Sequence, residues 1–419
     1  MPRFLYSALL YLLLPLLAGK LALRSVKQVA YRPHWRERFG YYRLPRQSGL
    51  IWLHCVSVGE TRAAAPLIHA LLEQYPERRL LLTHSSPSGR ATSEALFGNR
   101  VQRAYLPYDL PFMVRRFLRH FQPDLGVLLE TEIWFNLLAA CQQRQIPVLL
   151  ANARLSEKSA RGYAKLGKLV QNALQSLHLI AAQTPNDAKR FQGLGAKRVE
   201  TLGNLKFDAM PPSGTAAAGI QLRRWFGEQR PVFLAASTRE GEEALILDAL
   251  AATPIADLLT VIVPRHPQRF AEVEDLLKKR GLAYEKRSSL KDAVASRTQI
   301  ILGDSMGEMY AYYASADLCL IGGSLLPFGG QNLIEAMRLG KPVLLGRHTY
   351  NFAEVAATAI AQCAAWRVDN AQEIAHALQV LMAAPEKRLA MGASGLAMCE
   401  AGHGASAKTL ALLVDLLKN

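Results

Sequence analysis

Cysteine is scarce in this chain of 419 residues, and its few cysteines form no recognisable motif. They lie far apart, and no two make a Cys-x-x-Cys pair; the five are Cys55, Cys141, Cys319, Cys363 and Cys399. Zinc sites and disulfide frameworks both depend on closely spaced or evenly paired cysteines. The sequence therefore predicts buried free thiols in a reducing compartment.

Other motifs are missing as well. The chain has no G-x-x-x-x-G-K-[ST] phosphate loop, no H-E-x-x-H zinc pair and no G-x-S-x-G nucleophile elbow. It also lacks an Asp-x-Asp triplet, which argues against the usual metal-clamped sugar-nucleotide site. We therefore expect no bound metal and no other cofactor.

Acidic residues are outnumbered. The chain has 50 Lys and Arg against 34 Asp and Glu, a formal charge of +16, and half of its residues are hydrophobic. Such a chain folds, and its basic excess predicts a polyanionic partner. The excess is concentrated in residues 1–50, where Glu37 is the single acid. No basic stripe interleaved with aromatics occurs elsewhere, so we expect an anionic membrane surface and no nucleic acid.

The amino terminus carries an uncharged apolar run, Phe4–Gly19, which Leu21–Leu23 extend. A helix of about 20 such residues is long enough to cross a bilayer. A cleaved signal peptide is the rival interpretation, with a cleavage site near Gly19. Positive charge follows the run, so the positive-inside rule keeps the downstream chain in the cytoplasm. We predict that residues 1–24 form a membrane anchor, either spanning or lying flat.

Beyond the anchor, short apolar runs alternate with amphipathic stretches, which is typical of βα units around a parallel sheet. The expected strands are Leu50–Cys55, Arg79–Thr83, Val101–Leu106, Leu125–Leu129, Val148–Ala151, Leu179–Ala182, Val199–Leu202, Val232–Ala236, Leu259–Val263, Gln299–Leu302, Leu318–Ile321 and Pro342–Leu345. A stretch rich in proline, glycine and small residues, 203–219, predicts a linker. We therefore expect two doubly wound α/β domains, 25–210 and 211–419, facing each other across a cleft.

Polar side chains follow several of these strands. Glu60 comes after the first strand and just before a helical pattern that starts at Thr61, and Glu130 follows the strand Leu125–Leu129. Ligands bind at the carboxyl ends of strands in such sheets, so Glu60 is a candidate general base. The alternative is a carboxylate that only stabilises a helix start. Lys206 lies in the linker and suits a negatively charged substrate, although most single lysines are solvent-facing.

The second half of the chain carries residues that are suited to binding a nucleotide. Pro264 and Arg265 follow a strand, and an arginine fork suits phosphate, although an exposed loop cation is the alternative. Glycine turns then precede two helix starts, where backbone N–H groups suit a phosphate and a carboxylate suits ribose hydroxyls. The residues concerned are Gly307, Glu308, Met309, Asn332, Leu333, Ile334 and Glu335.

Taken in order, the motifs of this chain resemble those of the 3-deoxy-D-manno-octulosonic acid (Kdo) transferases of lipopolysaccharide assembly. The matching segments are WLHCVSVGE (52–60), LLETEIWFN (128–136), ANARLSEKS (151–159), GNLKFD (203–208), VPRHP (263–267), GDSMGEM (303–309), GGS (322–324), GGQNLIEA (329–336) and HTYNF (348–352). The resemblance covers nearly the whole chain. The chain departs from the family pattern at Cys55, Gln331, Leu333, Ile334 and Arg347.

The resemblance implies a GT-B fold and an inverting, metal-independent transfer of Kdo from CMP-Kdo to a lipid A precursor, tetraacyldisaccharide bisphosphate. It implies that Glu60 is the general base and that Glu130 and Lys206 support the transition state. It also implies that residues 25–210 bind the acceptor and that residues 211–419 hold CMP. Two alternatives remain: a membrane-associated GT-B enzyme that uses a UDP-sugar, and a non-catalytic scaffold on an anionic membrane.

Overall fold

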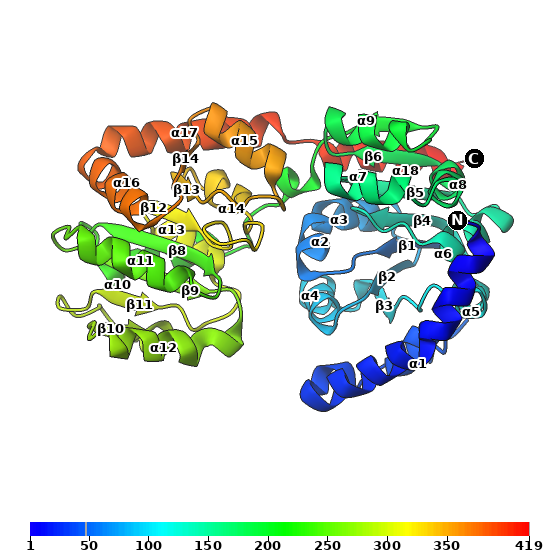
Figure 1. Cartoon of the computed structure of the whole chain (residues 1–419), viewed down its shortest axis with the longest axis horizontal. Helices are drawn as coiled ribbons and strands as arrows, with labels where there is room; N and C mark the ends of the chain where they lie inside the picture. Colours follow the sequence, from blue (N-terminus) through cyan, green and yellow to red (C-terminus); the bar gives the residue numbers. More distant parts are fainter. Residues whose placement is uncertain (47, 419) are drawn as a thin grey trace. The chain divides into compact units, whose positions relative to one another are not determined.

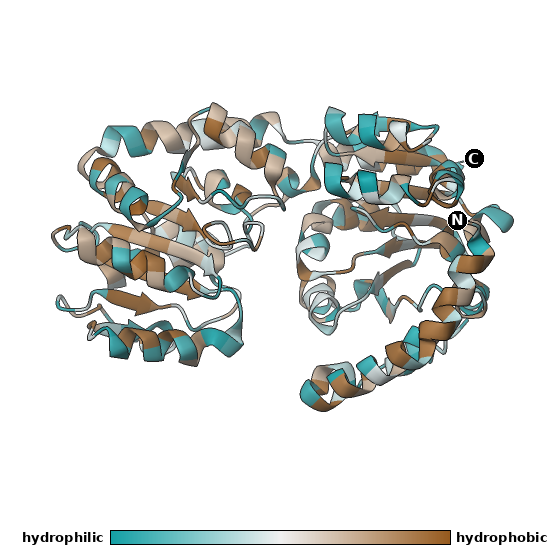
Figure 2. Cartoon of the chain, in the orientation of Figure 1, coloured by the Kyte–Doolittle hydropathy of each residue, from teal (hydrophilic) through white to brown (hydrophobic). Residues whose placement is uncertain are grey.

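Two parallel sheets of seven strands organise the chain, one in each of two units. The computed structural model describes residues 1–46 and 48–418. Unit 1 comprises Met1–Ala209 and Gly402–Asn419, and unit 2 comprises Met210–Ala401. Helices cover both faces of each sheet (Figure 1), and the central strands are largely hydrophobic (Figure 2). The doubly wound α/β class predicted for both halves is confirmed.

The sheet of unit 1 has the strand order β3-β2-β1-β4-β5-β6-β7. Its strands are β1 (Leu50–His54), β2 (Leu80–His84), β3 (Gln102–Tyr105), β4 (Pro123–Leu129), β5 (Val148–Ala153), β6 (Leu179–Ala182) and β7 (Val199–Thr201). Its helices are α1 (Arg3–Lys27), α2 (Val58–Ala63), α3 (Ala65–Gln74), α4 (Pro87–Phe97), α5 (Pro111–Phe121), α6 (Phe135–Gln143), α7 (Glu157–Ala164), α8 (Lys168–Ser176), α9 (Pro185–Gly193) and α18 (Ala405–Lys418). All five residues of β1 are buried, and so is β4 from Leu125 to Leu129, which explains why these segments are mainly apolar.

Unit 2 repeats this plan with the order β10-β11-β9-β8-β12-β13-β14. Its strands are β8 (Val232–Thr238), β9 (Leu259–Pro264), β10 (Tyr284–Lys286), β11 (Ile300–Leu302), β12 (Leu318–Ile321), β13 (Val343–Leu345) and β14 (Ala365–Arg367). Its helices are α10 (Thr215–Phe226), α11 (Glu242–Ala252), α12 (Phe270–Lys279), α13 (Met309–Ser315), α14 (Ile334–Arg338), α15 (Ala353–Ala361), α16 (Ala371–Ala383) and α17 (Pro385–Ala401).

Each sheet has one point where the strand order reverses, between β1 and β4 in unit 1 and between β8 and β12 in unit 2. Loops leave the two central strands in opposite directions there, which opens a crevice at their carboxyl ends. Glu60 and Glu130 follow β1 and β4. The glycine-rich segment that starts at Gly322 follows β12.

The predicted boundary at residue 210 agrees with the division into units, but the assignment of residues 402–419 to the second domain is wrong. The carboxylate of Asp208 accepts hydrogen bonds from the backbone N–H groups of Gly404, at 2.7 Å, and Ser406, at 2.5 Å. Leu413 of α18 is fully buried in the unit 1 core that also contains α3. Burial of this apolar face draws the last helix back to unit 1.

Smaller expectations also need correction. The predicted linker 203–219 ends early, because α10 begins at Thr215. The helix expected from Thr61 begins at Val58, with Ser57 as its N-cap. Strands β10 and β14, of three residues each, were not predicted. Four cysteines are buried as expected, but Cys363 is exposed.

Candidate functional site

Glu60 lies in the first turn of α2, at the carboxyl end of β1. Ser57 caps this helix by accepting a hydrogen bond from the Glu60 N–H at 3.3 Å. In return, the Glu60 carboxylate accepts bonds from the Ser57 hydroxyl at 2.9 Å and from the Val56 N–H at 2.8 Å. This reciprocal pattern is a variant of the capping box in which the Val56 N–H takes the place of the N-cap N–H, so the structural explanation weighed for Glu60 is real. It also holds the carboxylate in one orientation, which a catalytic role requires.

Glu130 and Lys206, which the sequence treated as separate candidates, form an ion pair. The Lys206 Nζ donates to Glu130 Oε1 at 2.9 Å, and both side chains are largely buried. Glu130 has a φ of +56°, in the left-handed region that side chains other than glycine rarely adopt. Backbone strain of this kind is concentrated at functional sites, where the surrounding structure holds it in place.

The carboxyl groups of Glu60 and Glu130 have pKa values that are shifted in opposite directions by their surroundings. Burial, and next the negative charge of Glu130, raise the pKa of Glu60 to about 8, although its hydrogen bonds to Val56 and Ser57 lower it. Burial also opposes ionisation of Glu130, but the charge and hydrogen bond of Lys206 outweigh it, so the pKa of Glu130 lies below its usual value. Glu130 is therefore ionised at neutral pH, while Glu60 can exchange a proton there. A carboxyl group that can exchange a proton, beside one that stays ionised, is an arrangement suited to acid–base chemistry.

Sequence reasoning missed His54, the last residue of β1. Its side chain is fully buried, and its Nδ1 lies 2.9 Å from the Thr83 hydroxyl. Its Nε2 has no hydrogen-bond partner and lies 3.8 Å from Glu132 Oε2. Burial lowers the pKa of His54 to about 3, so the ring is neutral. The only sequence signal was its position inside an otherwise apolar strand.

In unit 2, Pro264 ends β9 and Arg265 follows it directly. The Arg265 Nε donates a hydrogen bond to Gln331 Oε1 at 3.1 Å. Gln331 is one of the departures from the family pattern, and it contacts a candidate donor-binding residue. Since Asn332 is the next residue, the structure brings two of the predicted donor-binding segments together.

The two predicted helix starts of unit 2 are confirmed. Met309 opens α13 with Glu308 as its N-cap, and Ile334 opens α14 with Leu333 as its N-cap. Asn332 Nδ2 donates to Glu335 Oε1 at 3.1 Å. Glu308 pairs at 2.6 Å with Arg287, a residue that the sequence reasoning did not single out. Gly307 precedes α13 with a φ of +85°, which a side chain would strain.

The glycine segment after β12 differs from the expected donor cradle. The N–H groups of Gly322, Gly323 and Gly330 bind protein acceptors, namely Ala236 O, the Glu242 carboxylate and Gly323 O. A Cβ added at Gly322 would lie 2.4 Å from the Ser237 carbonyl oxygen. Gly322 therefore permits close backbone packing, and the N–H groups of these three glycines are already bound within the protein. Glu242 follows β8 much as Glu60 follows β1, but it is fully buried and cannot play the same part.

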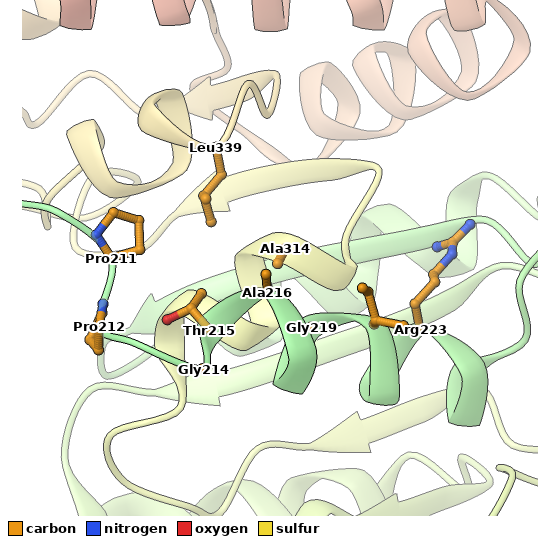
Figure 3. A pocket seen from close by; sticks show the side chains of 10 residues that line it. Pro211, Pro212, Gly214, Thr215, Ala216, Gly219, Arg223, Ala314 and Leu339 are labelled. Atoms are coloured by element: carbon orange, nitrogen blue, oxygen red, sulfur yellow. The ribbon is translucent and has the colours of Figure 1, made fainter.

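A pocket of about 520 Å³ lies elsewhere in unit 2 (Figure 3). Residues of α10, the segment before it, α13 and the end of α14 line it, and none of the candidate residues does so. Among residues 1–46 and 48–418, no group of three or more His, Cys, Asp or Glu side chains is arranged to hold a metal ion.

Two family models match the chain, one in each unit. The model for 3-deoxy-D-manno-octulosonic-acid transferases matches residues 33–209, and the model for glycosyl transferases group 1 matches residues 247–398. A Kdo transferase of Bordetella pertussis is 43% identical over 88% of this chain and 87% of its own length. The chain belongs to the Kdo transferase family.

Other similarities agree with this assignment. A Kdo transferase of Haemophilus influenzae is 38% identical over 99% of this chain and 98% of its own length. The crystal structure of Anabaena HepE in complex with UDP matches with a TM-score of 0.59. That match covers 88% of this chain and 99% of HepE at 16% identity, so it concerns the fold alone. The protein is therefore a glycosyltransferase of the Kdo transferase family with the predicted GT-B fold.

Proposed function

We propose that this Kdo transferase moves Kdo from CMP-Kdo to a hydroxyl of a phosphorylated lipid A precursor, with inversion and without a metal ion. Glu60 is the general base. The observation that carries the proposal is the half-buried Glu60 carboxylate, whose pKa is raised to about 8, at the strand-order reversal of unit 1. A base with a pKa near the working pH is the most effective one.

The proposed reaction is a single displacement. The acceptor hydroxyl oxygen bonds to the anomeric carbon of Kdo, the bond from that carbon to the CMP oxygen breaks, and Glu60 takes the hydroxyl proton. No covalent enzyme intermediate forms, so one aligned base is enough. Glu130 and Lys206 support the transition state by keeping a fixed pattern of charge beside the base.

The donor part of the proposal concerns unit 2. CMP leaves with an additional negative charge on its phosphate, and the guanidinium of Arg265 is suited to receive that charge. Asn332 and Glu335 form a polar pair at the start of α14, where ribose hydroxyls could be bound. Pro264, Gly307, Glu308, Met309, Leu333 and Ile334 complete the proposed CMP site.

Membrane association is the last part of the proposal. Helix α1 is long and apolar enough to serve as an anchor. The downstream units then work at the cytoplasmic face of the inner membrane, where an anionic surface and a phosphorylated lipid attract the basic amino terminus.

Glu60→Gln is the deciding experiment. This change keeps the size of the side chain, so we expect an intact fold and an unchanged rise in melting temperature with CMP, while transfer falls by about 10²- to 10⁴-fold. Glu73→Gln is the matched control, because Glu73 is an exposed glutamate in the neighbouring helix α3. Retained transfer in the Glu60 variant would show that the capping box is the whole role of this residue. Stabilisation by a uridine diphosphate in place of CMP would favour a UDP-sugar enzyme.

A further inference from the structure

Helix α1 has two different faces, and only one of them contacts the rest of unit 1. The Tyr6 ring packs edge-on against Phe135, with centroids 4.9 Å apart, and Tyr11 stacks on Phe112 at 6.0 Å. Leu21, near the other end of the helix, is buried. The helix therefore lies along the folded unit over much of its length.

The contacts at the amino-terminal end are polar as well as aromatic. The Tyr6 hydroxyl donates to Asp109 Oδ2 at 3.0 Å, and the Ser7 hydroxyl donates to Asn136 Oδ1 at 3.1 Å. Asp109 is 3% exposed, and its carboxylate also accepts the N–H groups of Asn136 and Leu137 at the start of α6. Asp109 thus belongs to the interior of unit 1, and Tyr6 is hydrogen-bonded directly to it.

The carboxyl-terminal end of α1 is held on the same unit. Arg32 donates to the Ser25 carbonyl oxygen at 2.9 Å. The guanidinium groups of Arg24 and Arg38 each lie 5.8 Å from the Tyr31 ring. Arg38 is buried and donates to the Ser85 carbonyl oxygen at 2.9 Å, just before α4. Both ends of the helix are therefore fixed to one folded body.

The opposite face of α1 is apolar and exposed. Its residues follow one another at intervals of three, four or seven, which places them on one side of a helix. They are Leu5, Leu9, Leu12, Leu16, Leu23 and Val26, and Leu12 is 77% exposed. Lys20 and Lys27 lie at the edge of this stripe, and both are exposed. Figure 2 shows the hydrophobic colouring of the helix.

We propose that α1 lies flat in the headgroup region of an anionic bilayer, with this stripe towards the acyl chains, and does not cross the membrane. A spanning helix would carry Tyr6 and Ser7 away from unit 1, and the buried Asp109 would lose one of its partners. A flat helix keeps these bonds, buries the leucines and leaves its lysines at the level of the lipid phosphates. This inference rests on the proposed membrane association and is independent of the transfer chemistry.

The topology can be tested by labelling with a membrane-impermeant maleimide. Cys363 is the exposed cysteine of unit 2, so it reports the side on which the catalytic units lie. A Pro2→Cys variant adds a second reporter just before α1. In sealed inner-membrane vesicles with the cytoplasmic face outward, we expect both sites to be labelled to the same extent without detergent. If Pro2→Cys reacts only after detergent is added, the helix crosses the bilayer and the proposal is wrong.

A second experiment tests the stripe itself. We expect L12K/L16K to lose most of its binding to vesicles of about one-third anionic phospholipid in a flotation assay, because lysines cannot enter the acyl region. Leu389→Lys is the matched control, since Leu389 is 73% exposed on α17 in unit 2, and it should float like the unmodified protein. If the unmodified protein, L12K/L16K and Leu389→Lys all float equally, the stripe is not the membrane contact and the proposal is wrong. Maleimide labelling and flotation both report where the protein lies, so their outcomes do not depend on the outcome of the Glu60 experiment.

Discussion

Lys206 and Glu130 lie 76 positions apart in the sequence, and the Lys206 ammonium donates a 2.9 Å hydrogen bond to Glu130 Oε1. This ion pair keeps Glu130 negatively charged, and that charge adds to burial in raising the pKa of Glu60. Through Glu130, Lys206 therefore helps to set the proton affinity of the proposed base.

The pH dependence of transfer should report the Glu60 carboxyl group. Glu60 acts as a base only when it is ionised, so kcat/KM should rise with pH and level off above about pH 8. At pH 6 we expect a rate about 100-fold below the plateau, because each pH unit below the pKa lowers the ionised fraction about tenfold. The measurement is the initial rate at subsaturating acceptor in buffers of constant ionic strength. A profile that is already flat at pH 6 would contradict the raised pKa.

Replacing Glu130 by Gln should shift this profile. Removal of the Glu130 charge takes away the second-largest cause that raises the pKa of Glu60, while burial remains. The rising limb should therefore move to lower pH, whatever happens to the maximal rate. A role for Glu130 in folding alone would leave the position of the limb unchanged.

The stability of the ion pair can be measured separately. Lys206→Met leaves Glu130 charged and largely buried without its main partner, so we expect a loss of about 1–3 kcal/mol in the free energy of unfolding of unit 1. The double variant E130Q/K206M should lose less than the sum of the two single changes. Denaturant unfolding of the four proteins gives the coupling energy, and additive losses would mean that the pair contributes nothing.

Arg265→Ala should weaken the binding of the donor, CMP-Kdo, more than the binding of the acceptor. The guanidinium is the proposed contact for the phosphate of CMP, so we expect KM for CMP-Kdo to rise about tenfold or more, which corresponds to the loss of one charged hydrogen bond of 1.5–3 kcal/mol. Arg280→Ala is a control in the same unit, because Arg280 is exposed and pairs with Asp248 on the surface. A larger change in the acceptor KM than in the donor KM would place Arg265 elsewhere in the mechanism.

A buried ion pair in unit 2 predicts a purely structural effect. Arg269 binds Glu243 through two hydrogen bonds, of 2.5 and 3.1 Å, and Glu243 is 1% exposed. Arg269→Leu leaves this carboxylate buried without its charged partner, with only the Thr238 hydroxyl still donating to it, which costs about 3–5 kcal/mol of stability. The unfolding transition of unit 2 should shift accordingly in denaturant. An E243L/R269L variant that regains part of the loss would identify the unpaired charge as the cause.

Much of the fold could be read from the sequence, because its central strands are buried on both faces. Strands such as Leu179–Ala182 and Leu318–Ile321 have the bounds that their apolar runs predicted. Strands β10 and β14 escaped prediction, since they have three residues each and are partly exposed at sheet edges. Helix α18 has the periodicity of any surface helix, so its sequence could not indicate which unit it covers.

The sequence by itself determined where the chemically important residues stand along the chain, because a parallel sheet brings the residues after its strands to one edge. It placed Glu60 and Glu130 at the ends of two strands, and glycines before the helices of unit 2. Only the tertiary structure decided the proton affinity of Glu60, since that depends on burial and on the distant Glu130–Lys206 pair. It also decided that both ends of α1 rest on one folded unit, through bonds such as that from Tyr6 to Asp109, which joins residues 103 positions apart. Local sequence patterns indicate which side chains must be buried. The protonation state of Glu60 and the packing of α1 on unit 1 depend instead on which distant residues become neighbours in the fold.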